Sequence, residues 1–302
     1  MSEPTLHTLS CPDIDGTHRM AYWQWGDPEN DHVVLCVHGL TRQGRDFDEL
    51  AQDLCTEFRV ICPDVVGRGQ SEWLKTPQSY QITQYASDIR LLLKQLQPST
   101  LDWVGTSMGG LIAMVLCGAD EPLLPVAVRR LVLNDVGPTM QWQALQRIGS
   151  SLGQSSRFDS VQQAAGALWQ TSSSFGPHSP AQWLALSRPM VKPVGDGTAA
   201  LTLNYDPAIA LPFHAITPES AARSEASLWH FYDNISAETL LIHGAESDFL
   251  SSATALEMTR RGPKAQLVEF GGVGHAPTLV SAQQRQVIKS FLLAPQDIRA
   301  VA

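Results

Sequence analysis

One serine in this chain of 302 residues stands in a spacing that suits nucleophilic catalysis. Ser107 lies in the run Gly105-Thr106-Ser107-Met108-Gly109, between apolar runs at 101–104 and 111–117. The first apolar run predicts a strand and the second predicts a buried helix, so the serine would occupy a tight strand-to-helix turn. The glycines leave room for the strand and the helix to meet, and the turn lifts the hydroxyl above the end of the sheet. The amide of Met108 would then lie at a helix N-terminus, where unpaired N–H groups favour negative charge.

A serine hydroxyl is a weak nucleophile near neutral pH, so it needs a base beside it and an acid that orients the base. Of the nine histidines, His275 is the best candidate base, because it lies in a glycine-rich loop, Gly271–Pro277, after the last predicted strand. Asp248 follows the predicted strand 239–243 and is the preferred acid. Asp135 also ends a predicted strand and is the alternative acid.

These side chains need a sheet that brings strand ends together. Two antiparallel strands are expected near Leu6–Ser10 and Met20–Trp25, with Asp15-Gly16 as the turn between them. Short apolar runs then alternate with helical patterns, which predicts strands at 33–37, 60–62, 101–104, 130–134, 239–243 and 266–270. Such runs, buried on both faces, indicate an α/β fold with a mostly parallel central sheet and helices on both faces.

The alternation is interrupted between residues 137 and 233. This interval is too long for a bare loop, and it contains four of the eight tryptophans: Trp142, Trp169, Trp183 and Trp229. We therefore predict a core domain formed by residues 1–136 and 234–302, with a helical cap inserted at 137–233. An insertion after a central strand would lie at the C-terminal edge of the sheet, where ligands bind in such folds.

Two further motifs strengthen this interpretation. His38-Gly39-Leu40 follows the third predicted strand, and Asp64-Val65-Val66-Gly67-Arg68-Gly69-Gln70-Ser71 follows the fourth. Together with the serine turn they resemble the α/β-hydrolase family over nearly the whole chain. The resemblance implies that the N–H groups of Leu40 and Met108 form an oxyanion hole and that His38 supports the oxyanion loop. It also favours Asp248, because most of the family takes its acid after that strand, although some relatives take it where Asp135 lies.

These residues lead us to expect a serine esterase that acts on small to medium substrates through an acyl-enzyme intermediate. A hydrolase of carbon–carbon bonds in ring-cleavage products is the alternative, although Thr106 departs from the asparagine that such enzymes usually carry before the serine. A cofactor-free oxygenase and a non-enzymatic ligand receptor on the same fold also remain open.

Charge and composition exclude several classes of binding partner. The net charge of −9 argues against nucleic acid and anionic membranes, and no apolar run is long enough to span a bilayer. Residues 1–5 lack the pattern of a signal peptide, and the five cysteines show no Cys-x-x-Cys spacing, so we expect a cytoplasmic protein with reduced thiols. We expect a small-molecule substrate and neither a metal nor a cofactor, and the sequence leaves the oligomeric state open.

Two arginines after the predicted oxyanion loop are candidate substrate ligands. Arg42 and Arg45 could hold a substrate carboxylate. The neighbouring Asp46, Asp48 and Glu49 offer an equally simple surface pairing.

Overall fold

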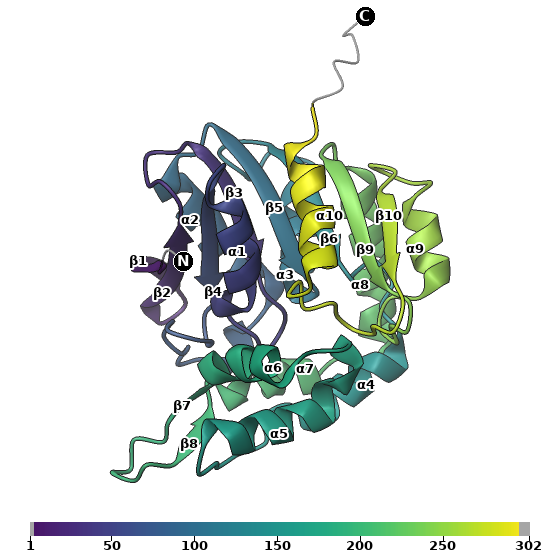
Figure 1. The fold of residues 1–302 in the computed structure, drawn as a ribbon. Coiled ribbons are helices and arrows are strands. Elements are labelled where there is room, and N and C mark those ends of the chain that lie inside the picture. Colours follow the sequence, from purple (N-terminus) through teal and green to yellow (C-terminus); the bar gives the residue numbers. More distant parts are fainter. Residues whose placement is uncertain (1–2, 296–302) are drawn as a thin grey trace, which may run out of the picture.

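The computed structural model describes residues 3–295 of the chain. Its centre is an eight-stranded sheet in the order β1 (Thr5–Asp13), β2 (Gly16–Trp25), β4 (Arg59–Asp64), β3 (His32–Val37), β5 (Thr100–Thr106), β6 (Val128–Asn134), β9 (Glu238–Gly244) and β10 (Gln266–Phe270) (Figure 1). β1 pairs antiparallel with β2, and β2 pairs antiparallel with β4. The remaining neighbours pair in parallel, which confirms the predicted sheet.

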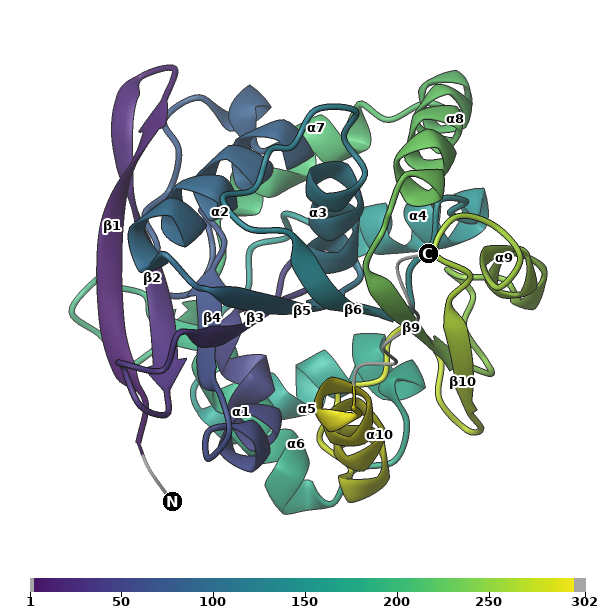
Figure 2. The same cartoon turned by 90° about the horizontal axis from the view of Figure 1, so that it is seen from above.

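Helices cover both faces of this sheet (Figure 2). α2 (Ile82–Leu96), α3 (Met108–Cys117) and α8 (Pro218–Asp233) lie on one face, and α1 (Asp48–Leu54) and α10 (Ala282–Leu293) lie on the other. Strand β3 shows why both faces need cover. Leu35 belongs to the core beneath α3, whereas its neighbours Val34 and Cys36 belong to the core beneath α1 and α10. α9 (Ser252–Met258) follows β9 and adds Met258 to the α3 core.

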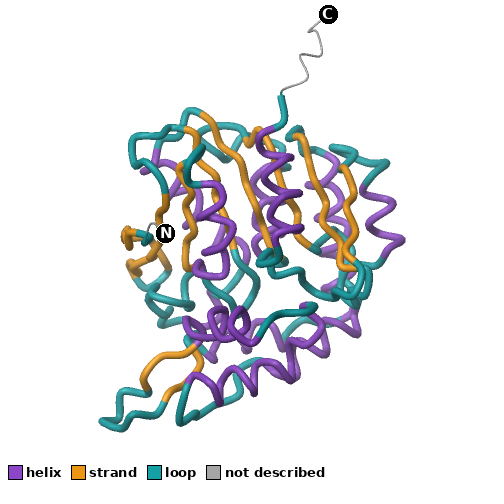
Figure 3. Tube along the Cα trace, in the orientation of Figure 1, coloured by secondary structure: helices purple, strands orange, loops and turns teal. Residues whose placement is uncertain are grey.

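A layer of short elements lies across one end of the sheet (Figure 1). It contains α4 (Trp142–Ser151), α5 (Val161–Ser172), α6 (Pro180–Ser187), α7 (Ala210–His214) and a hairpin of β7 (Val191–Pro193) and β8 (Leu201–Leu203). Figure 3 shows the hairpin projecting from an otherwise helical layer. Short 3-10 helices complete the chain: Gly44–Phe47, Pro77–Ser79, Ser173–Phe175, Arg188–Met190 and Pro207–Ile209.

Helix α8 differs from the rest of the interval 137–233, because it packs on the face of the sheet beside α3. A Cβ atom on Gly118, directly after α3, would lie 1.8 Å from the carbonyl oxygen of Phe231 in α8. The predicted interval therefore contains a layer over the strand ends, at 137–217, and one helix that packs with the core.

The layer is tied to the core away from its two chain connections. Gly69 N–H donates to the carbonyl of Asn204, and Asp206 N–H donates to the carbonyl of Gly67. The buried Tyr80 hydroxyl donates to Asp206 over 2.6 Å. None of the helices within residues 3–295 is long and apolar enough to cross a membrane.

Candidate active site

Ser107 occupies a strained turn between β5 and α3. Its backbone has φ +50° and ψ −115°, a region that side chains other than glycine rarely adopt. The turn closes only because its flanking residues are small: a Cβ atom on Gly109 would lie 2.0 Å from the carbonyl oxygen of Val37, and one on Gly105 would lie 2.6 Å from the backbone of Gly109. The predicted tight turn is therefore present at the end of β5.

His275 lies beside this serine. Its Nε2 is 3.0 Å from Ser107 Oγ, and its Nδ1 is 2.8 Å from Asp135 Oδ2. The imidazole side chain is about 10% exposed and stacks on the ring of Phe249, with 4.3 Å between the ring centroids. A nearly buried imidazole between a hydroxyl and a carboxylate can move a proton away from the hydroxyl.

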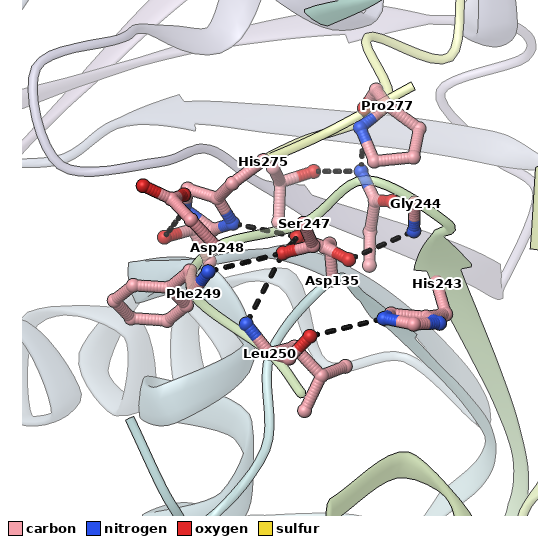
Figure 4. A network of polar contacts seen from close by, with 12 residues as sticks. Asp135, His243, Gly244, Ser247, Asp248, Phe249, Leu250, His275 and Pro277 are labelled. Carbon is pink, nitrogen blue, oxygen red and sulfur yellow. Dashed lines mark hydrogen bonds and ion pairs between the residues drawn. The ribbon is translucent and has the colours of Figure 1, made fainter. Parts of the chain in front are cut away.

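Asp135 is the carboxylate that orients this imidazole, and it is fully buried at the end of β6. Besides His275, it accepts hydrogen bonds from Gly244 N–H at 2.9 Å and from the Ser247 hydroxyl at 2.6 Å (Figure 4). Ser247 in turn accepts from the N–H groups of Phe249 and Leu250, which fixes its rotamer. Donors on both oxygens stabilise the ionised carboxylate away from water.

Asp248 does not take the place preferred for it from the sequence. Both of its oxygens accept from the Arg147 guanidinium, at 2.6 and 2.7 Å, and its side chain is 48% exposed. Partial burial raises the pKa of Asp248, but Arg147 and His275 together bring it below its ordinary value. The preference for Asp248 as the partner of His275 is therefore wrong in this structure, and the alternative, Asp135, holds that position.

Two residues support this arrangement: Ser247, for which the sequence contains no signal, and Phe249, whose apolar ring next to Asp248 suggests a shield from water for the acid and the imidazole. Ser247 anchors Asp135, and Phe249 covers the imidazole. Both lie in the loop after β9, on either side of Asp248, so this loop contributes to the site although its aspartate faces elsewhere.

His38 and Arg68 brace the loop after β3. His38 is buried; its Nδ1–H donates to the carbonyl of Gly39 at 2.7 Å, and its Nε2 accepts from Val65 N–H at 2.9 Å. Burial lowers the pKa of His38 to about 3, so the ring stays neutral. Arg68 Nε donates to the carbonyl of Leu40 at 2.8 Å, and its Nη2 lies 3.6 Å from Met108 Sδ. One guanidinium therefore contacts both residues expected to form the oxyanion hole.

Arg42 and Arg45 are engaged in local ion pairs. Arg42 binds Asp46 through two hydrogen bonds of 2.6 and 2.7 Å, and Arg45 binds Asp48 in the same manner. Neither arginine lines the cavity beside Ser107. The surface pairing, which the sequence left as the alternative to substrate binding, is the arrangement found.

A cavity of about 640 Å³ opens at Ser107. Leu40, Met108 and Phe249 line it together with Ser107. Its walls combine core residues such as Leu111 and Val115 with residues of the overlying layer, among them Met140, Leu145, Ile148 and Phe213. This volume and mostly apolar lining suit a small organic substrate.

One cluster has the chemistry of a metal site. Ligand atoms of Cys11, His18 and Asp88 lie within 4.8 Å of one another, all buried. Each ring nitrogen of His18 lies 3.0 Å from a carboxylate, one of Asp13 and the other of Asp88. Burial, assisted by Asp88, raises the pKa of the Cys11 thiol to about 12. These contacts join the β1–β2 hairpin to α2 and lie outside the cavity at Ser107.

Sequence similarity to known proteins points to one family. Residues 32–282 match the family model described as alpha/beta hydrolase fold. The chain is 46% identical to the 3-hydroxybutyrate-oligomer hydrolase of Cupriavidus necator, over 96% of this chain and 98% of that protein.

Solved structures agree with this match. An alpha/beta hydrolase from Novosphingobium aromaticivorans has a TM-score of 0.83 at 34% identity, covering 97% of this chain and 99% of that one. E-2-(acetamidomethylene)succinate hydrolase has a TM-score of 0.76 at 22% identity, covering 95% and 99% of the two chains, which supports the fold alone.

Proposed function

Because this chain is a hydrolase that belongs to the α/β-hydrolase family, we propose that it is a serine esterase that cleaves oligomers of 3-hydroxybutyrate. The observation that carries the serine mechanism is the hydrogen-bonded series Ser107–His275–Asp135, whose serine lines the cavity. The substrate class rests on the name of the relative from Cupriavidus necator, whose length is covered almost completely.

The chemistry follows from the order of these contacts. His275 Nε2 takes the hydroxyl proton as Ser107 Oγ bonds to the ester carbonyl carbon, and the N–H groups of Leu40 and Met108 receive the developing oxyanion. The carbon–oxygen bond of the ester then breaks, and the imidazolium returns its proton to the leaving alcohol. Water, deprotonated by His275, attacks the acyl-enzyme, and the acid leaves as Ser107 regains its proton. Asp135 holds the ring tautomer and stabilises the imidazolium throughout.

The layer at 137–217 serves as the cap in this proposal, with α8 as its fixed neighbour on the core. Tyr80 and Asp206 hold the layer over the cavity, so residues of both parts contact the substrate. The sequence suggested a cap at residues 137–233. In our proposal the cap still begins at residue 137, but it ends at residue 217, because α8 packs with the core.

Hydrolysis of the 3-hydroxybutyrate dimer and of p-nitrophenyl butyrate tests the proposal directly. The purified protein should release 3-hydroxybutyrate from the dimer. Ser107→Ala should reduce both activities by a factor on the order of 10⁶ and abolish labelling by a fluorophosphonate. Ser174 is a suitable control, because it lies in the 3-10 helix Ser173–Phe175 and its carbonyl accepts from Gly274 N–H beside His275. Ser174→Ala should retain labelling at Ser107. Turnover by Ser107→Ala above a tenth of that of the parent would contradict the assignment of Ser107 as the nucleophile.

The same experiment separates the other classes. A carbon–carbon hydrolase would cleave ring-cleavage products in preference to both esters. An oxygenase would lose turnover under anaerobic conditions, and a receptor would leave both esters intact.

A further inference from the structure

The lining of the cavity at Ser107 includes one cationic residue, Arg223. Among the residues of the described range 3–295 that line it, no other lysine, arginine, aspartate or glutamate is present. The protein as a whole carries a net charge of −9, which repels anions. Arg223 therefore supplies a local positive charge in a protein that is negative overall.

Arg223 belongs to a polar strip on α8. Ser220, Arg223, Ser224 and Ser227 all line the cavity, and their spacing of three and four residues places them on one face of the helix. The strip is about 10 Å long, because seven residues of α-helix rise about 1.5 Å each. It lies in a mostly apolar cavity. The hydroxyls of Ser220 and Ser227 donate to the carbonyls of Thr217 and Arg223, so the guanidinium is the main donor that the strip presents.

The Arg223 guanidinium has no partner within residues 3–295. Arg223 is exposed. Apart from the backbone hydrogen bonds of the helix, its one hydrogen bond in the described residues joins its carbonyl to the Ser227 hydroxyl, which donates. Arg42, Arg45, Arg147 and Arg261, in contrast, each bind a carboxylate. The three acidic residues of α8 have other partners: Glu225 accepts from Thr139, and Asp233 pairs with Arg261. Glu219 interacts with its own backbone N–H and the Thr217 side chain at the start of the helix.

A free guanidinium beside an apolar chamber suits a carboxylate, because its planar donors match the two carboxylate oxygens. We propose that Arg223 binds the terminal carboxylate of a hydroxyacid ester, with the alcohol half of the substrate lying along α8. This inference rests on the proposed ester hydrolysis. In an oligomer of a hydroxyacid, the free carboxylate always belongs to the alcohol half that leaves when the adjacent ester bond breaks. The α8 side of the cavity is therefore the leaving-group site, and the enzyme selects esters that end in a carboxylate.

Three substrates test this assignment: the 3-hydroxybutyrate dimer as the free acid, the same dimer as its methyl ester, and p-nitrophenyl butyrate. The unaltered protein should prefer the free acid to its methyl ester. Arg223→Gln should lower kcat/KM for the free acid about 10- to 100-fold, mostly through KM, since a hydrogen bond to a charged group contributes that much. Its activity on the two neutral esters should change less than about threefold.

Arg90→Gln is the matched control, because Arg90 is also an exposed helical arginine without a carboxylate partner in the described part of the chain, and it lies on α2 outside this cavity. It changes the net charge equally and should leave all three activities unaltered. Arg223→Lys should recover part of the preference.

The outcomes distinguish the two proposals. Equal cleavage of the free acid and its methyl ester by the unaltered protein, or an equal effect of Arg223→Gln on all three substrates, would overturn the role of Arg223 while ester hydrolysis stands. Absence of any ester cleavage by the unaltered protein would overturn the proposed function itself.

Discussion

At the scale of single residues, the arrangement depends on which of two aspartates meets His275. Asp135 is fully buried and accepts from three donors, whereas Asp248 is half exposed and bound to Arg147. Asp135→Asn should fold normally, since asparagine tolerates the positive φ of 52° found there. It should lower kcat by ~10⁴, because the amide presents the imidazole with the wrong tautomer.

Asp248→Asn is the matched comparison for this prediction. It removes an exposed ion pair, which contributes roughly 0–1 kcal/mol, and should leave kcat within about threefold of the parent. Steady-state kinetics of both variants on one ester decide the matter. A larger loss in Asp248→Asn than in Asp135→Asn would return the role to Asp248.

At the scale of elements, the loop after β3 and the first turn of α3 must be held together, and Arg68 performs this task. Its guanidinium is fully buried, contacts Leu40 and Met108, and donates to the carbonyl of Val66 at 2.6 Å. It also lies over the rings of Tyr80 and Tyr85. Lysine has one compact ammonium group and cannot make these contacts together.

Arg68→Lys should therefore loosen the oxyanion hole while the sheet remains intact. We expect kcat to fall on the order of 10²-fold, as when an oxyanion donor is misplaced, with KM changed less than about threefold. Arg261→Lys, in an exposed pair with Asp233, is the control and should behave as the parent. A change in KM alone would show that Arg68 acts on substrate binding rather than on the oxyanion hole.

At the scale of the whole molecule, the buried side chains of His38 and Asp64 make the free energy of unfolding depend on pH in opposite directions. Burial lowers the pKa of His38 from 6.5 to about 3, so between these values only the unfolded chain binds its proton. The free energy of unfolding then rises with pH. Burial raises the pKa of Asp64 from 3.8 to about 6, so in that range only the folded chain keeps its proton and stability falls as pH rises. The two effects oppose each other between 3.8 and 6.

Variants separate the two contributions. The stability of the parent relative to His38→Gln should increase by roughly 1.4 kcal/mol per pH unit up to pH 6.5 and then stay level. The stability of the parent relative to Asp64→Asn should instead decrease over 3.8 to 6. Urea unfolding at several pH values measures both differences. A difference for His38→Gln that does not vary with pH would contradict a neutral, buried imidazole.

Local sequence alone predicted the strands of the sheet and the tight turn at Ser107. The strand runs are apolar because the sheet is covered on both faces, as the split of β3 between two cores shows. Gly105 and Gly109 lie so close to neighbouring backbone that neither position has room for a Cβ atom. The turn therefore requires glycine on both sides of Ser107, and five residues suffice to recognise it. His275 was identifiable because the loop after a last strand must lie at the same edge as Ser107.

Only the tertiary structure decided between the aspartates and revealed Arg223. β6 and β9 are parallel neighbours, so the ends of both strands bring an aspartate near His275. Which carboxylate turns inward depends on Gly244 and Ser247, more than a hundred residues after Asp135, and on Arg147, which pairs with Asp248 from α4. Likewise, the sequence singled out Arg42 and Arg45 for their proximity to the oxyanion loop, yet Asp46 and Asp48 neutralise them locally. Arg223 gains its place in the cavity from the packing of α8 against α3, a contact between distant segments that no local pattern encodes.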